Sequence, residues 1–350
     1  MKIAIILRPN DQAPPQEYGS CGRVVAPLVE GLLKKNHDIT VYTAKPSDLK
    51  CKIVKPEGII TDKNRKKIDI KTHLWASYVS RIFDHIKDIE MSGKGYDIIN
   101  NHDDPIAFVL GRQLNLGYKM ITTLHGSAGD ASLSIFPLYP KENFSAVSKS
   151  HMLSYKNYNK NMNFLGFVYN SISKNHPFSK NKRNYLFSVS RIQPNKGQKN
   201  AIKLAKKGGL DLIIAGNITD KNYFNQEIKP HITKDLSKPD RKEERKNFIW
   251  NLGKYQPARD KTEITYVEEV TERERDQIMK HAKASLFLIE REEPFGLTFI
   301  EAGIVGTPAL AFNRGAVSEI IKPGINGLIG NSIDELVKYV EIIDKISPYD

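Results

Sequence analysis

One segment, residues 286–327, restricts the fold of this chain more than any other. It opens with the apolar run 286–289 (LFLI), which is typical of a strand buried inside a parallel sheet. A polar loop over 290–295 follows, then a helical pattern of small and apolar residues over 297–305 and a second strand at 309–312. Because strand, helix and strand alternate, the segment predicts an α/β fold with a doubly wound parallel sheet.

Two carboxylates in this segment are eight positions apart, Glu293 in the loop and Glu301 about one turn inside the helix. Between them, the backbone N–H groups of Phe295, Gly296 and Leu297 have no acceptor inside the helix that they open. A helix N-terminus with a glycine suits a phosphate group. The pattern therefore predicts a phosphate beside two carboxylates, one of which can hold a ribose diol and the other sugar hydroxyls.

The block EPFGLTFIEAGIVGTPALAF, with the later PGINGLI, resembles the nucleotide-sugar site of family four of the retaining glycosyltransferases. That resemblance implies the GT-B fold, in which two doubly wound Rossmann-like domains face each other across an interdomain cleft. It also implies a UDP- or GDP-sugar as the donor substrate, no separate cofactor and no metal. Without the resemblance, the same block fits a strand–loop–helix unit with two solvated glutamates.

A chain of 350 residues is long enough for two domains of ordinary size. We expect an N-terminal, acceptor-side domain over 1–172 and a polar, basic linker over 173–184. The C-terminal domain, 185–350, is then the nucleotide-sugar-binding one. Within it, 234–261 is rich in charge and is interpreted as an insertion.

A pair of basic residues, Arg191 and Lys196, lies in a loop after the first strand of the C-terminal domain. The resemblance implies that this pair holds the phosphates of the donor. The leaving group is a nucleoside diphosphate, so its developing negative charge must be neutralised. Arginine offers a fork of donors to two oxygens, and lysine offers a point charge. The alternative is a basic pair on the surface.

The N-terminal domain carries weaker signals. Gly19 and Ser20 follow the first strand where the resembling family usually has Gly-Gly beside the diphosphate, so Ser20 is a departure. In TTLHG, the resemblance implies that His125 faces the transferred sugar, whereas a core histidine is the alternative. The segment 167–172 resembles a strand ending in Asn-Gly-Ile-Asp, of which Asn170 is retained as a donor-site residue.

Charge is unevenly distributed along the chain. The net charge is +13, of which residues 1–184 carry +11, from 27 Lys and Arg against 16 Asp and Glu. Such an excess suggests an anionic partner, namely a membrane surface, an acidic acceptor or nucleic acid, although a generally Lys- and Asn-rich composition is an equal explanation. Cys21 and Cys51 predict neither a disulfide framework nor a zinc site, and His102-Asp103-Asp104 lacks a metal-ligand spacing.

The opening segment MKIAIILRPN is expected to be a strand and not a signal peptide, and no apolar run reaches the ~18 residues of a membrane span. We therefore expect a cytoplasmic protein that contacts the inner face of an anionic membrane peripherally.

Taken together, the residues and the resemblance predict a metal-independent, retaining transferase. It would move a hexose from a nucleoside-diphosphate sugar to the hydroxyl of a glycan, a lipid-linked glycan or a small molecule. Three alternatives stay open: a nucleotide-sugar epimerase of the same fold, a catalytically weak nucleotide-sugar-binding protein, and a transferase acting on nucleic acid, which is the least expected partner.

Overall fold

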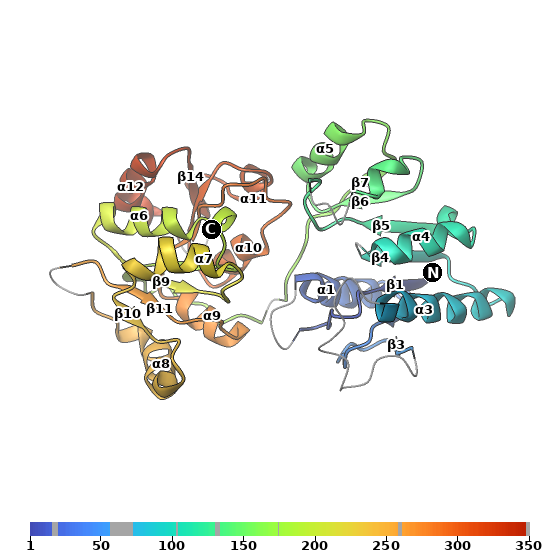
Figure 1. The fold of residues 1–350 in the computed structure, drawn as a ribbon, viewed down its shortest axis with the longest axis horizontal. Helices are drawn as coiled ribbons and strands as arrows, with labels where there is room; N and C mark the ends of the chain where they lie inside the picture. Colours follow the sequence, from blue (N-terminus) through green and yellow to red (C-terminus); the bar gives the residue numbers. More distant parts are fainter. Residues whose placement is uncertain are drawn as a thin grey trace. The chain divides into compact units, whose positions relative to one another are not determined.

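The structure is a computed structural model that describes residues 1–15, 20–56, 73–102, 104–129, 134–173, 175–257 and 261–347. The chain divides into two compact units, Met1–Ser173 and Lys174–Asp350 (Figure 1). We call them unit 1 and unit 2 and describe each by itself. Among the described residues, no helix combines the length and the apolar character that crossing a bilayer requires.

Unit 1 is built on a seven-stranded sheet in the order β3-β2-β1-β4-β5-β6-β7, in which each strand runs parallel to its neighbours. Its strands are β1 (Lys2–Ile6), β2 (Asp38–Tyr42), β3 (Lys52–Val54), β4 (Ile98–His102), β5 (Met120–Thr123), β6 (Phe144–Ala146) and β7 (Phe164–Phe167). Its helices are α1 (Ser20–Lys34), α3 (His73–Met91), α4 (Pro105–Gln113) and α5 (Lys149–Tyr158).

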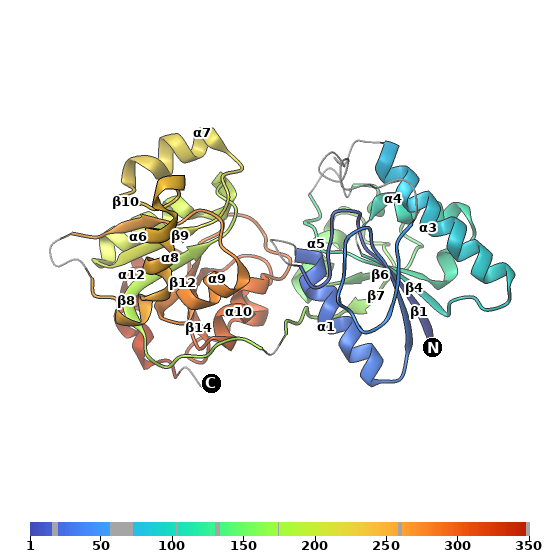
Figure 2. The same cartoon turned by 90° about the horizontal axis from the view of Figure 1, so that it is seen from below.

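Side chains of the sheet in unit 1 alternate between two cores, as the period-2 geometry of a strand requires. Ile3 and Ile5 of β1 pack with residues of α1, whereas Ala4 and Ile6 pack with residues of α3 and α4. Figure 2 shows α1 on the opposite side of the sheet from α3 and α4. Because both faces of the sheet are covered, the sequence of β1 is continuously apolar, and this apolar run is what predicted the strand.

Unit 2 contains a second parallel sheet of seven strands, in the order β10-β11-β9-β8-β12-β13-β14. Its strands are β8 (Arg183–Val189), β9 (Asp211–Ala215), β10 (Lys234–Asp235), β11 (Ile264–Tyr266), β12 (Ala282–Phe287), β13 (Ala309–Phe312) and β14 (Gly327–Gly330). Its helices are α6 (Gln198–Gly208), α7 (Lys221–Tyr223), α8 (Lys242–Trp250), α9 (Glu272–Met279), α10 (Leu297–Ile304), α11 (Val317–Ile320) and α12 (Ile333–Ile342). Residues of α6 and α12 form the core on one face, and residues of α8, α9 and α10 form the core on the other.

Two strands differ from their predicted positions. β12 covers Ala282–Phe287, about four residues earlier than the apolar run 286–289, because its first half is made of small residues and one lysine, which carry little strand signal. β7 ends at Phe167, so the strand expected over 167–172 is wrong. Asn170 therefore follows this strand by three residues and does not belong to it.

The charged segment 234–261 is packed into unit 2. Leu236, Ile249 and Leu252 are buried in the core under α9 and α10. β10 extends the sheet by pairing with β11. The charged side chains of α8 lie on the surface. The buried anchors are spaced far apart in a polar sequence, so the sequence alone does not show that this segment contributes to the core.

The segment expected to be a linker, 173–184, belongs to unit 2 from Lys174 onward and is bonded to the rest of that unit. The imidazole of His176 lies 2.7 Å from Asp276 of α9. The ammonium group of Lys182 donates to the backbone carbonyl of Lys280 and to the hydroxyl of Thr307. These bonds fix the described part of this segment to the surface of unit 2.

Candidate functional site

The candidate site in unit 2 lies where the order of strands reverses. β8 and β12 are neighbours, and the chain leaves β8 toward β9 on one side while β12 leads to β13 on the other. Ligands in doubly wound folds bind beyond the carboxyl ends of the strands at such a point. The loops over 190–197 and 288–296 start there and are joined by a hydrogen bond from the Glu290 N–H to the Asn195 carbonyl, 3.2 Å.

Gly197 allows the two loops to approach closely. Its φ is +78°, and a Cβ atom placed on it would lie 1.9 Å from the carbonyl oxygen of Leu288. The side chain of Asn200, one turn along α6, donates to Glu290 over 2.8 Å. The loop that carries the predicted basic pair is therefore packed directly against the loop that carries Glu293.

Lys196 and Glu293 face each other across these loops, with 3.6 Å between Nζ and Oε2. Their side chains are only 14% and 16% exposed. Burial lowers the pKa of Lys196 from its ordinary value, and the carboxylate of Glu293 opposes that shift. Residues that are 97 positions apart in the sequence thus form a half-buried ion pair, as expected if both serve one site.

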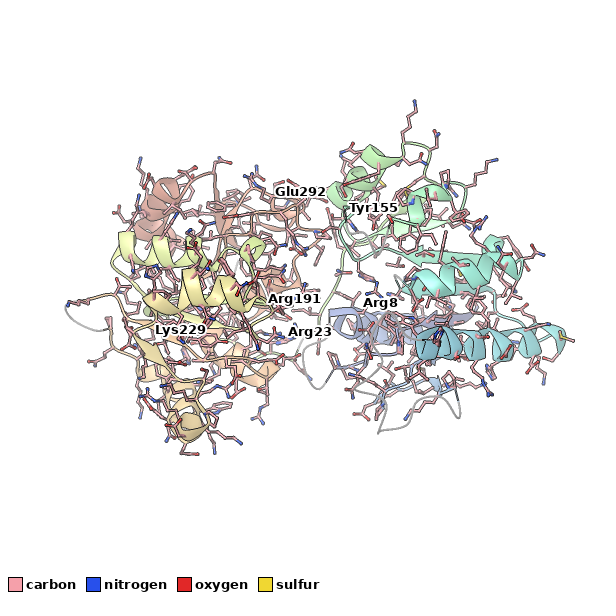
Figure 3. All side chains as sticks on the ribbon, in the orientation of Figure 1. Arg8, Arg23, Tyr155, Arg191, Lys229 and Glu292 are labelled. Carbon is pink, nitrogen blue, oxygen red and sulfur yellow. The ribbon has the colours of Figure 1, made fainter. Side chains whose placement is uncertain are left out.

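Two arginines add positive charge beside Lys196. Arg191, from the loop after β8, and Arg291, from the loop after β12, are both close enough for their charges to lower the pKa of Lys196. The Nε atoms of both arginines are buried and have no hydrogen-bond partner among the described residues. Figure 3 labels Arg191 and Glu292, one residue from each of these loops. Buried donors of this kind, gathered around a lysine, suit an anionic ligand.

Arg291 was not predicted. It stands two residues before Glu293, inside the same motif, and its sequence signal is only that a cation precedes the two acidic residues Glu292 and Glu293. The structure gives Arg291 a partly buried place beside the predicted basic pair.

The N-terminus of α10 follows the loop of Glu293 directly. Gly296 is its N-cap residue and has no side chain with which to cap the helix. The buried Phe295 anchors the loop, and Leu297 opens the helix. A neighbouring turn supports this arrangement, because the N–H of Ala316 donates to the carbonyl of Glu293 over 2.9 Å. The backbone near the predicted phosphate position is therefore held on both sides.

Glu301 has a different environment from Glu293. It is 1% exposed, and its Oε1 accepts from Nη1 of Arg275 in α9 over 2.8 Å. Arg275 also donates to Asp276, which in turn contacts His176 over 2.7 Å. The hydrogen bond to Asp276 raises the pKa of His176, and the charges of both carboxylates raise that of Arg275 against the effect of burial.

Arg275 and Asp276 were missed for a clear reason. The helix that contains them reads ERERDQIM, which has the composition of a solvated helix. Both side chains are nevertheless almost fully buried. No local sequence pattern indicates that Arg275 is buried, because its partner Glu301 comes from another helix.

Unit 1 has its own cluster at the corresponding position, beyond the carboxyl ends of adjacent strands. His102 ends β4 and His125 follows β5, and Nδ1 of the former lies 2.9 Å from Nε2 of the latter. Their rings are stacked with 5.2 Å between centroids. Burial lowers the pKa of His102 to about 4 and that of His125 well below its ordinary value, with Arg8 contributing to the second shift. Both imidazoles are therefore neutral at pH 7.

The remaining predicted residues are placed as follows. Gly19 lies outside the described residues, and Ser20 begins α1, although its side chain is not described. Asn170 lies in the segment after β7 and is partly buried. These three residues belong to unit 1, whereas Arg191, Lys196 and Glu293 belong to unit 2.

Comparison with known proteins adds a family and a fold. The family model for glycosyl transferases group 1 matches residues 170–346. A search of curated protein sequences gives no match. Among solved structures, the chain is similar to AviGT4, a glycosyltransferase involved in avilamycin A biosynthesis, with 16% identity, a TM-score of 0.64 and coverage of 98% of this chain and 90% of that one.

Two further structures are similar along nearly their whole length. Sucrose-phosphate synthase from Thermosynechococcus elongatus is 16% identical, with a TM-score of 0.62 and coverage of 98% of this chain and 89% of that one. HepE from Anabaena, solved with UDP and glucose, is 15% identical, with a TM-score of 0.63 and coverage of 100% and 94%. With two parallel seven-stranded sheets, these likenesses confirm the predicted α/β, GT-B fold class.

Proposed function

The chain belongs to the group 1 family of glycosyl transferases, and from that premise we propose that it transfers a hexose from a nucleoside-diphosphate sugar to an acceptor hydroxyl with retention of configuration. The observation that carries the proposal is the cluster of Arg191, Lys196 and Arg291 in unit 2, where two buried Nε atoms have no hydrogen-bond partner in the part of the chain that the structure describes. HepE, a structural neighbour, was solved with UDP and glucose, which supports a nucleotide sugar as the donor here.

Leaving-group stabilisation is the step that the cluster serves best. When the bond between the sugar and the diphosphate breaks, negative charge develops on the phosphate oxygens, and preorganised donors in a half-buried site stabilise it strongly. Three side-chain cations can neutralise a diphosphate in the way that a divalent cation does in other enzymes. We therefore propose that transfer needs no metal.

The donor is proposed to lie along the loop of Glu293 and the start of α10. The diphosphate would accept hydrogen bonds from the backbone N–H groups of Phe295, Gly296 and Leu297, as phosphates do at helix N-termini. Glu293, whose present partner is Lys196, would turn to the hydroxyls of the transferred sugar once the diphosphate takes over the lysine.

Glu301 is proposed to hold the ribose diol. A carboxylate offers about four acceptor positions, and Arg275 occupies one of them. The pair with Arg275 fixes the orientation of the carboxylate. Because Glu301 is 1% exposed, the ribose would have to pack closely against the first turns of α10.

Unit 1 is proposed to supply the acceptor side, with His125 toward the transferred sugar and Gly19, Ser20 and Asn170 toward the donor. The acceptor hydroxyl would approach from the face that the diphosphate leaves, and its proton would pass to the leaving phosphate oxygen. In this scheme no side chain acts as a dedicated base. A neutral imidazole at His125 fits such a role, because it can donate or accept a hydrogen bond without carrying charge.

The test is a screen of UDP- and GDP-sugars for thermal stabilisation and for release of the nucleoside diphosphate. At a ligand concentration one hundred times its Kd, binding stabilises the protein by about 2.7 kcal/mol, which is readily seen as a rise in Tm. Release of diphosphate that is unchanged by EDTA would support the metal-free transfer. Stabilisation without any turnover would instead support the binding protein, and loss of rate with EDTA would refute the metal-free scheme.

A further inference from the structure

A cluster in unit 1 brings together three side chains that none of the local motifs connects. Cys21 comes from the first turn of α1, His102 from the end of β4 and His125 from the loop after β5. One ligand atom from each of them lies within 4.8 Å of the other two. Cys21 and His102 are buried, and His125 is partly exposed.

The distances are close to those around a bound zinc ion. With Zn–N bonds of about 2.0 Å and Zn–S bonds of about 2.3 Å in a tetrahedral site, ligand atoms are roughly 3.5 Å apart. Nδ1 of His102 and Nε2 of His125 now lie 2.9 Å apart, and all three distances among the ligand atoms are at most 4.8 Å. Small side-chain rotations would therefore open enough space for the ion between the three ligands.

The chemical state of the ligands also fits. A metal ion binds an imidazole through the lone pair of one ring nitrogen. Cys21 must bind as a thiolate, and its position at the N-terminus of the 15-residue helix α1 favours an anion. The positive charge of Arg8 near His125 disfavours a bound cation, and the negative charge of the Cys21 thiolate offsets that repulsion.

We propose that Cys21, His102 and His125 form a binding site for one Zn²⁺ ion, with a fourth position open to water. Imidazole and thiolate together select zinc over Mg²⁺ or Ca²⁺, which prefer oxygen ligands. On binding, the thiol proton is released to solvent and the hydrogen bond between the two histidines is broken. The absence of a local Cys and His spacing explains why the sequence predicted no zinc site.

The consequence for activity rests on the proposed function, whereas the binding itself does not. If His125 faces the transferred sugar, zinc would occupy the ring and reduce transfer. The site is therefore inhibitory in this scheme. A chelator would leave the rate of metal-free enzyme unchanged and would restore that of zinc-loaded enzyme.

Binding is measured on the full chain after removal of metal, with Co²⁺ as a spectroscopic probe and Zn²⁺ as its competitor. We expect one equivalent of Co²⁺, a thiolate-to-cobalt absorption band, and loss of that band when one equivalent of Zn²⁺ is added. Cys21→Ala and His102→Gln should each weaken binding at least roughly tenfold, because even partners outside the ligand set change metal affinity by 10–100-fold.

The chain offers matched controls. Cys51→Ala removes the other cysteine, and His73→Gln removes an exposed histidine of the same unit, so neither should change the affinity. If a variant does not fold, alkylation of the unaltered protein decides instead, since Zn²⁺ should protect Cys21 and not Cys51. A missing thiolate band in the unaltered protein, or a band that survives Cys21→Ala, would overturn the site. An intact site with no zinc effect on transfer would refute only the inhibitory role.

Discussion

At the scale of single residues, Lys196 is the most direct test of the leaving-group proposal. Its side chain is 14% exposed and faces Glu293. Replacing Lys196 therefore removes a positive charge from a partly desolvated site. Lys196→Ala is expected to lower kcat by roughly tenfold to a thousandfold, the range for one charge-stabilising group. Lys207→Ala, at the exposed end of α6, is the control and should keep the rate. Equal rates for both variants would remove Lys196 from the mechanism.

The two carboxylates are expected to respond differently to substitution. Glu301→Gln should weaken binding of the free nucleoside diphosphate by roughly ten- to a hundredfold, since one charge-assisted bond contributes about 1.5–3 kcal/mol. Glu293→Gln should leave that affinity nearly unchanged and reduce transfer. Calorimetric titration with the diphosphate decides between them, and a loss confined to Glu293→Gln would mean that the roles are reversed.

Glu301→Gln has a second expected effect, because it leaves the buried Arg275 with one carboxylate fewer. Breaking a buried pair by removing one partner costs about 3–5 kcal/mol. The free energy of unfolding must therefore be measured alongside affinity. If the Glu301→Gln variant folds and binds the diphosphate as tightly as the parent, Glu301 stabilises the fold and does not bind the ribose.

How far the sequence predicts the site depends on where each contact comes from. Arg191, Lys196 and Glu293 stand in linear motifs, so the sequence singles them out, and their roles stay predictions. The sequence does not single out Arg275, because burial of a charge follows from helix packing that no short pattern encodes. The contact between His102 and His125 joins two strands that are neighbours in the sheet, and their 23-residue separation carries no signal of it.

At the scale of elements, Gly197 determines how closely the two site loops approach. Gly197→Ala would place a methyl group against the Leu288 carbonyl at a positive φ and should separate the loops. Gly209→Ala, at the other end of α6, is a matched control with φ +62° and no atom within 4 Å of the added Cβ. The control should lose about 1 kcal/mol from backbone strain alone. Gly197→Ala should lose more, as followed by Tm and by diphosphate affinity, and an equal loss would contradict the close approach.

The contact between His176 and Asp276 should make stability depend on pH. The hydrogen bond to Asp276 raises the pKa of His176 in the folded state above the ordinary value of about 6.5. The stabilisation is then complete below that value and is lost as pH rises through the raised pKa. We expect the Tm difference between the parent and His176→Gln to be larger at about pH 6 than at about pH 9. A difference that does not change with pH would show that the imidazole is not charged there.

Elements were predictable in proportion to their apolar content. β1 and β13 were predicted because each is a continuous apolar run that is buried on both faces. The first half of β12 was not found, since Ala, Lys and Ser give little strand signal even in the middle of a sheet. In the same way, the anchors of α8 were hidden in a charged segment.

At the scale of the whole molecule, the uneven charge leads to a prediction about membranes. Residues 1–184 carry a net +11, and we propose that they mediate peripheral contact with anionic lipid. Vesicles with phosphatidylserine should retain the protein at low salt better than neutral vesicles do, and added salt should release it. Equal retention on both kinds of vesicle would refute the contact.

Each sheet is assembled from one continuous stretch of chain, the first between Lys2 and Phe167 and the second between Arg183 and Gly330. Among the strands that the structure describes, none pairs with a strand of the other half. During synthesis on the ribosome, all strands of the first sheet are therefore available before the second sheet begins to emerge. The N-terminal half can reach its native pairing without waiting for the remainder, which limits the time during which its apolar strands are exposed to other nascent chains.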